Sequence, residues 1–249
     1  SCSFSSRRII IITERDIIKQ VVYRQIVGFT LQYELCYTNV LNMLELGGIP
    51  LLASERGEND PIIIGGGPCA YNAEPIADFF DVLDIGEGEE MLPRFTRMYA
   101  KMKREGASRA EILRATSHLD GFYVPALYEV EYGADGTISS FEPKYDDIPR
   151  TVQKQIIADL DSVYFPDKFV MPYIETVHDR IVPEVYRGCI RGCRFCQAGM
   201  IYRPVREKSP DVLDAQCRRL YENTGFDEIS LCSLSISDYS RQLSVGGAI

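Results

Sequence analysis

Three cysteines at a C-x3-C-x2-C spacing are the residues of this sequence best suited to chemistry. They are Cys189, Cys193 and Cys196, with glycines at Gly188 and Gly192. Thiolate sulfur binds iron–sulfur clusters and zinc, and the glycines permit the tight backbone path that wraps one metal centre. Because three thiolates leave one iron of a four-iron cluster open, the loop predicts a cluster that can bind and cleave a substrate.

A structural zinc site is the main alternative for this loop. Such sites close with four protein ligands, and the nearest candidates for a fourth are Cys217 and His178, neither at a usual zinc-finger spacing. We therefore favour iron and sulfur over zinc. His178 could transfer protons or contact a substrate, but pairing with Asp179 in a loop is the simpler interpretation. Apolar or helical surroundings predict small buried thiols elsewhere, at Cys36, Cys69, Cys217 and Cys232.

Four arginines surround the cysteine loop: Arg191, Arg194, Arg203 and Arg206. They could tune the charge of a cluster or meet a carboxylate. The alternative is solvation, or pairing with acids such as Glu207. The sequence assigns no specific role to any one of them.

Composition narrows the class of protein. The chain has 249 residues, enough for one large domain or two ordinary ones, and 45% of them are hydrophobic, which suffices for a buried core. A net charge of −9 argues against binding to a phosphate backbone. No run approaches the roughly 18 apolar residues of a membrane span. Clustered cysteines are typical of metal binding in a reducing cytoplasm, which is the location we expect. The chain begins at Ser1 and ends at Ile249 after Gly-Gly-Ala, so we expect a fragment.

Strands alternate with helices in the N-terminal half. Buried strands are predicted at 25–32, 61–64 and 81–85, with helices at 39–46, 75–80, 91–105 and 107–118. Residues 1–25 supply no convincing first strand. Since each strand leads to glycine, the pattern predicts a parallel, Rossmann-like α/β layer. Open sheets bind ligands at strand carboxyl ends, where this sequence has Gly65, Gly66, Gly67, Gly86 and Gly88.

The pattern changes after residue 120. The elements predicted from there are a hairpin of 123–132 and 137–141, an extended proline-rich linker over 143–183, and strands at 181–186 and 228–234. The first of these two strands would deliver the cysteine loop. Between the strands, Ser209 as N-cap and Pro210 in the first turn begin a helix that stops before Gly225.

The cysteine loop resembles the signature of radical S-adenosylmethionine (SAM) enzymes, including the aromatic Phe195 directly before the third cysteine. Residues 177–180 and 187–204 resemble one subgroup, uncharacterised radical SAM proteins with a cobalamin-binding-type domain on their N-terminal side. Residues 27–90 resemble that domain. Three stretches carry this second resemblance: Gly28–Glu34, Gly65–Pro68 and Ile85–Glu89.

The resemblance implies that Cys189, Cys193 and Cys196 each hold one iron of a 4Fe–4S cluster. The fourth iron would bind the amino and carboxylate groups of SAM. One electron would then cleave a carbon–sulfur bond, and the resulting 5′-deoxyadenosyl radical would abstract hydrogen from a substrate. Phe195 would lie beside the adenine. An electron donor such as flavodoxin or ferredoxin is implied as a partner.

In this family the second barrel strand often ends in Gly-Gly-Glu, which holds the methionine amino group. Here the strand ends in Leu234 followed by Ser-Ile-Ser-Asp, so Ser235, Ser237 and Asp238 are the candidate substitutes. The alternative is that they are turn and N-cap residues.

Cobalamin, or a related nucleotide-tailed cofactor, is a candidate ligand of the N-terminal layer by the same resemblance. The Asp-x-His-x-x-Gly motif that replaces the lower base of cobalamin is absent, and the histidines His118 and His178 lie in other contexts. Base-on binding without a histidine and a degenerate domain kept for docking both stay open.

The expected fold is therefore α/β. It comprises a Rossmann-like, cobalamin-binding-type domain at 1–120, a hairpin and linker at 121–178, and the truncated start of a radical SAM partial (β/α)6 barrel at 179–249. The expected function is a radical SAM enzyme of unknown substrate. A non-catalytic iron–sulfur or cofactor-binding module is the alternative, followed by a zinc-binding scaffold.

Overall fold

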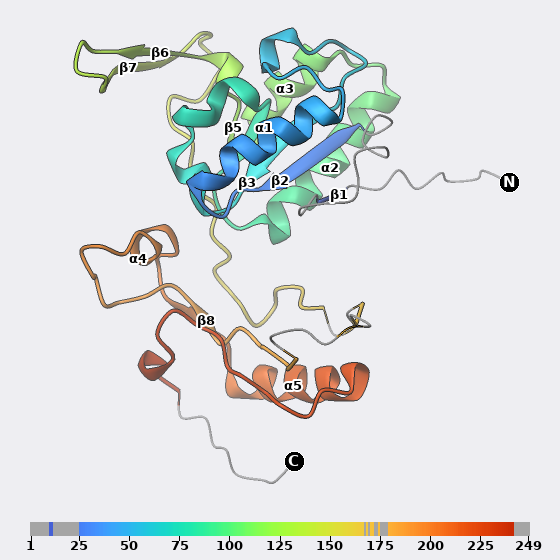
Figure 1. Ribbon diagram of the computed structural model, residues 1–249, viewed down its shortest axis with the longest axis vertical. Helices are drawn as coiled ribbons and strands as arrows, with labels where there is room; N and C mark the ends of the chain where they lie inside the picture. Colours follow the sequence, from blue (N-terminus) through green and yellow to red (C-terminus); the bar gives the residue numbers. More distant parts are fainter. Residues whose placement is uncertain are drawn as a thin grey trace, which may run out of the picture. The chain divides into compact units, whose positions relative to one another are not determined.

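The computed structural model describes residues 10–11, 25–166, 168, 170–171, 174 and 179–241 (Figure 1). The chain divides into two compact units, Ser1–Ile156 and Ile157–Ile249. His178 lies outside the described residues, and the domain boundaries expected near residues 120 and 178 stay predictions.

A five-stranded sheet in the order β1-β2-β3-β4-β5 forms the centre of the first unit. Its strands are β1 (Ile10–Ile11), β2 (Ile26–Thr30), β3 (Ile62–Gly66), β4 (Val82–Asp84) and β5 (Phe122–Tyr123). The pairs β1–β2, β2–β3 and β3–β4 are parallel, and β5 closes the order antiparallel to β4. This confirms a mixed α/β fold. The Rossmann-like assignment stays a prediction.

The strand β1 corrects the expectation that residues 1–25 contribute none. Ile10 pairs with Val27, and Ile11 pairs with Gly28. Two paired residues are too short a run for a period-2 pattern to be visible in the sequence. The pairing depends on the free edge of β2, which lies elsewhere in the chain.

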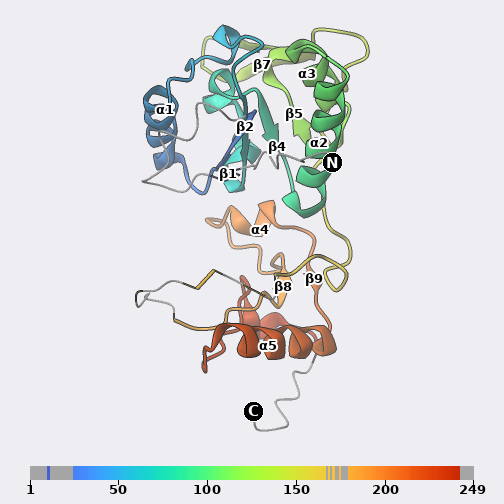
Figure 2. The ribbon, with the colours of Figure 1, turned by 90° about the vertical axis from the view of Figure 1, so that its right-hand side faces the viewer.

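Helices cover both faces of this sheet, α1 (Tyr37–Leu46) on one face and α2 (Gly88–Arg104) and α3 (Arg109–Ser117) on the other (Figure 2). Alternate strand residues explain the two faces, since successive side chains of a strand point to opposite sides. Val27 and Ile63 belong to the core cluster that includes α1, whereas Ile26 and Ile62 belong to the cluster that includes α2 and α3. The continuous apolar runs of the sequence thus correspond to strands buried on both faces.

A capping residue sets the start of α3, whereas α2 begins without a side-chain cap. The α3 helix begins after Ser108, whose hydroxyl accepts from the N–H of Glu111 in a complete capping box. The α2 helix begins at Gly88, three residues before the predicted start. The helix predicted at 75–80 is a 3-10 helix. The described part of this unit contains further 3-10 segments at Glu34–Cys36, Ala53–Glu55, Pro68–Asn72 and Pro125–Leu127, besides Glu74–Phe79 itself.

A buried ion-pair network joins β3 to two neighbouring segments. Oδ2 of Asp81 lies 3.0 Å from Nη1 of Arg56 and 2.7 Å from Nη2 of Arg109. The same oxygen accepts from the N–H of Ile63 at 2.7 Å. Arg56 also donates to three backbone carbonyls. Buried charges require such pairing and hydrogen bonding, so this network is structural.

The predicted hairpin is present as β6 (Tyr128–Tyr132) and β7 (Ile138–Pro143). Its first strand begins later than expected, because Tyr123 pairs with Leu83 of the main sheet and the 3-10 turn Pro125–Leu127 intervenes. The stretch predicted as an extended linker is partly packed. Ile148 is buried, and Gln155 forms a parallel bridge with Gly86. The apolar residues of this stretch stand singly among prolines, so they show no helical or strand periodicity from which the packing could be predicted.

The second unit contains a β-α-β arrangement. Ile181 and Glu184 form parallel bridges with Ile229 and Cys232, which lie beyond the helix α5 (Pro210–Thr224). Its other named elements are β8 (Tyr186–Arg187), α4 (Ala198–Ile201), β9 (Arg206–Glu207) and the 3-10 segment Ile236–Asp238. The strand β8 pairs antiparallel with β9. The barrel assignment stays a prediction, although the two predicted strands do run parallel.

The α5 helix has the predicted ends. The Ser209 hydroxyl accepts from the N–H of Val212 at 3.4 Å, Pro210 is in the first turn, and Gly225 ends the helix in the left-handed conformation. Leu213 packs from this helix against β8. Within the described residues, no helix combines the length and the apolarity that crossing a membrane requires.

Candidate functional site

The cysteine loop begins directly after β8 and folds back on the segment before β9. Gly188 has φ 93°, and a β-carbon there would lie 2.7 Å from the carbonyl oxygen of Pro204 and 2.9 Å from that of Tyr202. Gly192 also has positive φ, 63°, but open space around it. The first glycine is therefore required by close backbone packing, and the second only by its conformation.

The three thiols of the loop are accessible and free of disulfide bonds. Cys193 is exposed, whereas Cys189 and Cys196 are half-buried. The N–H of Cys196 donates to the carbonyl of Cys193 at 3.1 Å, which makes a turn between the last two cysteines. The N–H of Arg191 donates to Sγ of Cys189 at 3.5 Å. Backbone donors to ligand sulfur are a normal feature of iron–sulfur sites.

The sulfur atoms do not yet form an assembled metal site. Among the described residues, no group of three or more His, Cys, Asp or Glu side chains is positioned to hold a metal ion. The donor set itself fits a thiolate-ligated cluster: three free thiols on one short loop, two glycines that allow it to close, and an N–H directed at sulfur. Metal binding and local folding are coupled, so a cluster would draw these thiols together. Their role as ligands stays a prediction.

Phe195 and the end of the second strand are the other predicted contacts of the second unit. Phe195 is 92% exposed, so its ring face is accessible beside Cys196. Ser235 directly precedes the 3-10 segment Ile236–Asp238, and both follow the strand residue Cys232. Ser237 is exposed.

Arg191 and Asp238 connect the cysteine loop to this strand end. Nε of Arg191 donates to Oδ2 of Asp238 at 2.7 Å, and Nη2 donates to Oδ1, so the pair is bidentate. The Arg191 guanidinium, followed by the Ser235 hydroxyl, holds the pKa of the Asp238 carboxyl below its usual range. The sequence offered no signal for this pair, because two opposite charges 47 residues apart form no local pattern.

The other loop arginines differ from one another. Arg206 is buried and donates to the carbonyls of Pro204, Ile157 and Tyr202 at 3.0, 2.8 and 3.3 Å. These contacts hold the backbone at these three residues together, so its role is structural. Arg194 and Arg203 are exposed. Glu207, expected as an acidic partner of these arginines, accepts from the N–H and hydroxyl of Ser240.

Four other cysteines were expected to be buried. Cys69 is buried, Cys36 and Cys217 are half-buried, and Cys232 is exposed. The expectation is wrong for Cys232. Its strand has a bridge partner on one side, at Glu184, and the described residues leave its side chain uncovered.

The glycine-rich strand ends of the first unit are filled by the chain itself. A β-carbon on Gly65 would lie 2.6 Å from the Phe80 ring, and one on Gly67 would lie 2.9 Å from the carbonyl oxygen of Leu31. One on Gly86 would lie 2.8 Å from the backbone nitrogen of Gln155. Gly66 faces the carboxyl group of Asp84, whereas a β-carbon on Gly88 would lie 3.2 Å from the Leu92 side chain and 3.9 Å from Oδ2 of Asp84.

This packing explains the glycines without a ligand. The cradle that cobalamin would need is occupied by side chains and by the backbone at Gln155, and His118 instead pairs with Asp147. The described residues therefore do not fit cobalamin at these strand ends. The ligand-binding role of the glycines stays a prediction without support from their contacts.

Asp84 is a residue that sequence reasoning missed. It ends β4 and is 6% exposed, and burial raises the pKa of its carboxyl to about 7. An acid inside an otherwise apolar strand was the available signal. Ionisable groups with shifted pKa values are common at functional sites, but here the carboxyl group packs on two glycines of its own unit.

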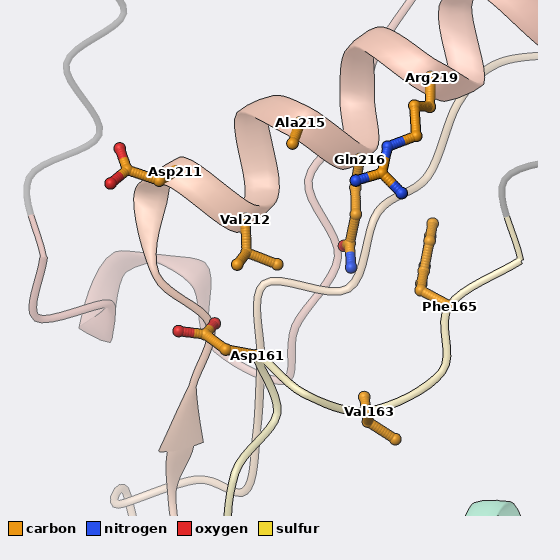
Figure 3. Close-up of a pocket in the computed structure, with 8 residues that line it drawn as sticks. All are labelled: Asp161, Val163, Phe165, Asp211, Val212, Ala215, Gln216 and Arg219. Carbon is orange, nitrogen blue, oxygen red and sulfur yellow. The ribbon is translucent and has the colours of Figure 1, made fainter.

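A cavity of about 290 Å³ lies along α5 in the second unit (Figure 3). Its lining consists of Asp161, Val163, Phe165, Asp211, Val212, Ala215, Gln216 and Arg219. Gln216 and Arg219 extend from the helix toward the segment that carries Phe165. Nζ of the buried Lys208 donates to Oε1 of Gln216 at 3.2 Å and lies 4.6 Å from the Phe165 ring centre. Among the described residues that line this cavity, none belongs to the cysteine loop.

Comparisons with known proteins show what the chain is similar to. Residues 9–125 match the family described as "Radical SAM proteins, N-terminal". The chain is also 27% identical over 216 residues to an uncharacterized protein, MJ0966, of Methanocaldococcus jannaschii. That alignment covers 84% of this chain and 38% of the relative. The chain thus spans 38% of the length of the curated relative it matches.

Proposed function

We propose that this chain, a member of the radical SAM superfamily by its match over residues 9–125, is part of an enzyme. That enzyme would cleave SAM reductively and begin radical chemistry on a substrate. The observation that carries the proposal is the C-x3-C-x2-C loop after β8, on the same chain as that match. The activity, substrate and partners of the whole protein are part of this proposal, because the relative is much longer than this chain.

Cys189, Cys193 and Cys196 would hold a 4Fe–4S cluster. Such a cluster, when bound, supplies the electron that breaks a carbon–sulfur bond of SAM and so generates the 5′-deoxyadenosyl radical. Gly188 lets the loop turn directly after β8, with Cys189 as its first donor. The N–H of Arg191 would stabilise the Cys189 thiolate, since hydrogen bonds to sulfur help to set the potential of such clusters.

The remaining predicted residues would orient SAM. Phe195 has an exposed ring beside Cys196, suited to packing against the adenine. Ser235, Ser237 and Asp238 lie at the end of the second strand and offer oxygen atoms to an ammonium group. The electron must come from outside these residues, and we propose a one-electron donor such as flavodoxin or ferredoxin. No step through cobalamin is proposed.

Anaerobic reconstitution with iron and sulfide tests the metal site. We expect a brown protein with about four iron atoms per chain, as a 4Fe–4S cluster requires. Cys193→Ala should abolish the cluster, whereas Cys217→Ala, on α5 and outside the loop, should retain it. A colourless protein that holds one tightly bound zinc ion would contradict the proposal and favour the zinc scaffold.

Incubation with dithionite and SAM tests the catalytic part. We expect 5′-deoxyadenosine and methionine in equal amounts, measured by chromatography. If the cluster forms and neither product appears, this chain acts as an iron–sulfur binding module, and cleavage of SAM by it is excluded.

A further inference from the structure

We propose that Arg191 is a positioning residue that fixes the cysteine loop to the end of the second strand through Asp238. The inference rests on the proposed function for its consequence, but its geometry stands on its own. Arg191 lies between the first two cysteines, and its guanidinium binds both carboxylate oxygens of Asp238. A bidentate arginine–carboxylate pair fixes direction as well as distance.

The pair closes a ring of contacts through both segments. The hydroxyl of Tyr186, in β8, donates to the carbonyl of Ser235. From β8 the chain enters the loop, where the N–H of Arg191 donates to Sγ of Cys189. The Arg191 side chain then returns to Asp238, three residues after Ser235. One ring thus joins strand, sulfur ligand and second strand end.

Tyr239 supports this ring from the other side. Its ring stacks on that of Tyr186 with centres 6.5 Å apart and planes 12° apart. Its hydroxyl donates to the carbonyl of Lys208 at 2.8 Å, directly before α5. Asp238 is therefore attached to a packed element, whereas the loop around Gly192 has open space. In the Arg191–Asp238 pair, Asp238 is therefore the anchored residue, and Arg191 belongs to the cysteine loop whose position the pair fixes.

Burial indicates that the pair orients rather than stabilises. The side chain of Arg191 is 55% exposed and that of Asp238 is 13% exposed. Because the guanidinium of this pair is largely solvated, the pair contributes little to global stability. The expected effect is therefore local: the pair sets where Cys189 lies relative to Ser235 and Asp238, the residues proposed to receive the amino group of SAM.

Limited trypsin digestion of the metal-free 249-residue chain tests the geometry without any cofactor. Asp238→Asn keeps every tryptic site but weakens the hold on the loop, so cleavage after Arg194 should become about two- to fivefold faster. The matched control is Asp214→Asn, which weakens the exposed Arg218–Asp214 pair on α5 and should leave that rate unchanged. An unchanged rate in Asp238→Asn would overturn the proposal.

The reconstituted protein tests the consequence. Arg191→Gln should bind iron as the native protein does, yet need about tenfold more SAM to produce the SAM-dependent change in the electron paramagnetic resonance spectrum of the reduced cluster. Arg191→Lys keeps the positive charge but cannot donate in parallel to both carboxylate oxygens of Asp238, so it should resemble Arg191→Gln. Arg194→Gln, in the same loop, should resemble the native protein.

A double-mutant cycle separates positioning from charge. Adding Arg191→Gln to Asp238→Asn should cause little further weakening of SAM binding, because the shared contact is already lost. Full additivity, or full recovery in Arg191→Lys, would overturn positioning in favour of a charge effect. If the native protein forms no cluster at all, the proposed function fails while the trypsin result still decides whether Arg191 holds the loop.

Discussion

A β-carbon on Gly66 would lie 2.7 Å from the carboxyl carbon of Asp84, so these two residues at neighbouring strand ends share one space. Asp84 is buried, and its side chain is short. Neither residue can be enlarged without moving the other. The relationship makes Gly66 a packing position, and burial raises the pKa of the Asp84 carboxyl to about 7.

Gly66→Ala should destabilise the first unit by about 1–3 kcal/mol, the usual cost of overpacking a core. The measurement is the urea midpoint of unfolding. Gly28→Ala is the matched control, because a β-carbon there would meet Ile64 at an ordinary 3.6 Å. If Gly66→Ala unfolds at the same urea midpoint as the native protein, the Asp84 side chain can move away from residue 66 at no cost, which would contradict the close packing.

Asp84 should make stability fall as pH rises. Burial raises the folded-state pKa of its carboxyl to about 7, whereas the unfolded value is near 3.9. Between these values the folded state binds the extra proton, so the free energy of unfolding decreases from about pH 4 to about pH 7 and then levels off. The total change is on the order of 4 kcal/mol.

Asp84→Asn removes this titration. The variant should lack the component of the decline between pH 4 and 7 that the native protein shows, as measured by denaturation at several pH values. Parallel curves for the two proteins would mean that Asp84 titrates normally.

Asp81→Ala should destabilise the first unit by about 3–5 kcal/mol, because it leaves two guanidinium groups without their shared, buried carboxylate. Thermal or urea unfolding measures the loss. Asp214→Ala, which removes an exposed partner of Arg218 on α5, should cost less than about 1 kcal/mol. Equal effects of the two changes would contradict a buried role for Asp81.

Gly188→Ala should prevent cluster assembly, because its β-carbon would overlap the backbone at Tyr202 and Pro204. Gly192→Ala meets no neighbour within 4 Å. It should cost only about 1–2 kcal/mol of left-handed backbone strain and retain the cluster. Iron content after anaerobic reconstitution distinguishes the two. A full cluster in Gly188→Ala would show that the loop can leave the segment before β9.

Local patterns in the sequence predicted the elements that carry their own signals. Ser209, Pro210 and Gly225 delimit α5 because each satisfies or ends the helix through its own chemistry. The buried strands β2 and β3 were visible as apolar runs closed by polar residues or glycine. The cysteine spacing predicts a metal-binding loop, since its three thiols lie within the eight residues Cys189–Cys196, and that role stays a prediction.

Pairings between distant segments were not predictable in the same way. The two-residue strand β1 exists only against β2, and Gln155 pairs with Gly86 from within a stretch that looked like a linker. The Arg191–Asp238 contact joins two of many surface charges. Each depends on tertiary placement, for which composition and periodicity carry no information.

The backbone pairing of Gly86 with Gln155 has a consequence for any ligand of the first unit. Gln155 donates its N–H to the carbonyl of Ile85 at 3.0 Å and accepts from the N–H of Glu87 at 3.2 Å. A free ligand that binds those same backbone groups would have to compete with the segment that carries Gln155. Because that segment is covalently tethered, its effective concentration is in roughly the millimolar range. The segment around Gln155 thus occupies the backbone groups that follow β4, and only a ligand that binds more tightly than this segment could displace it.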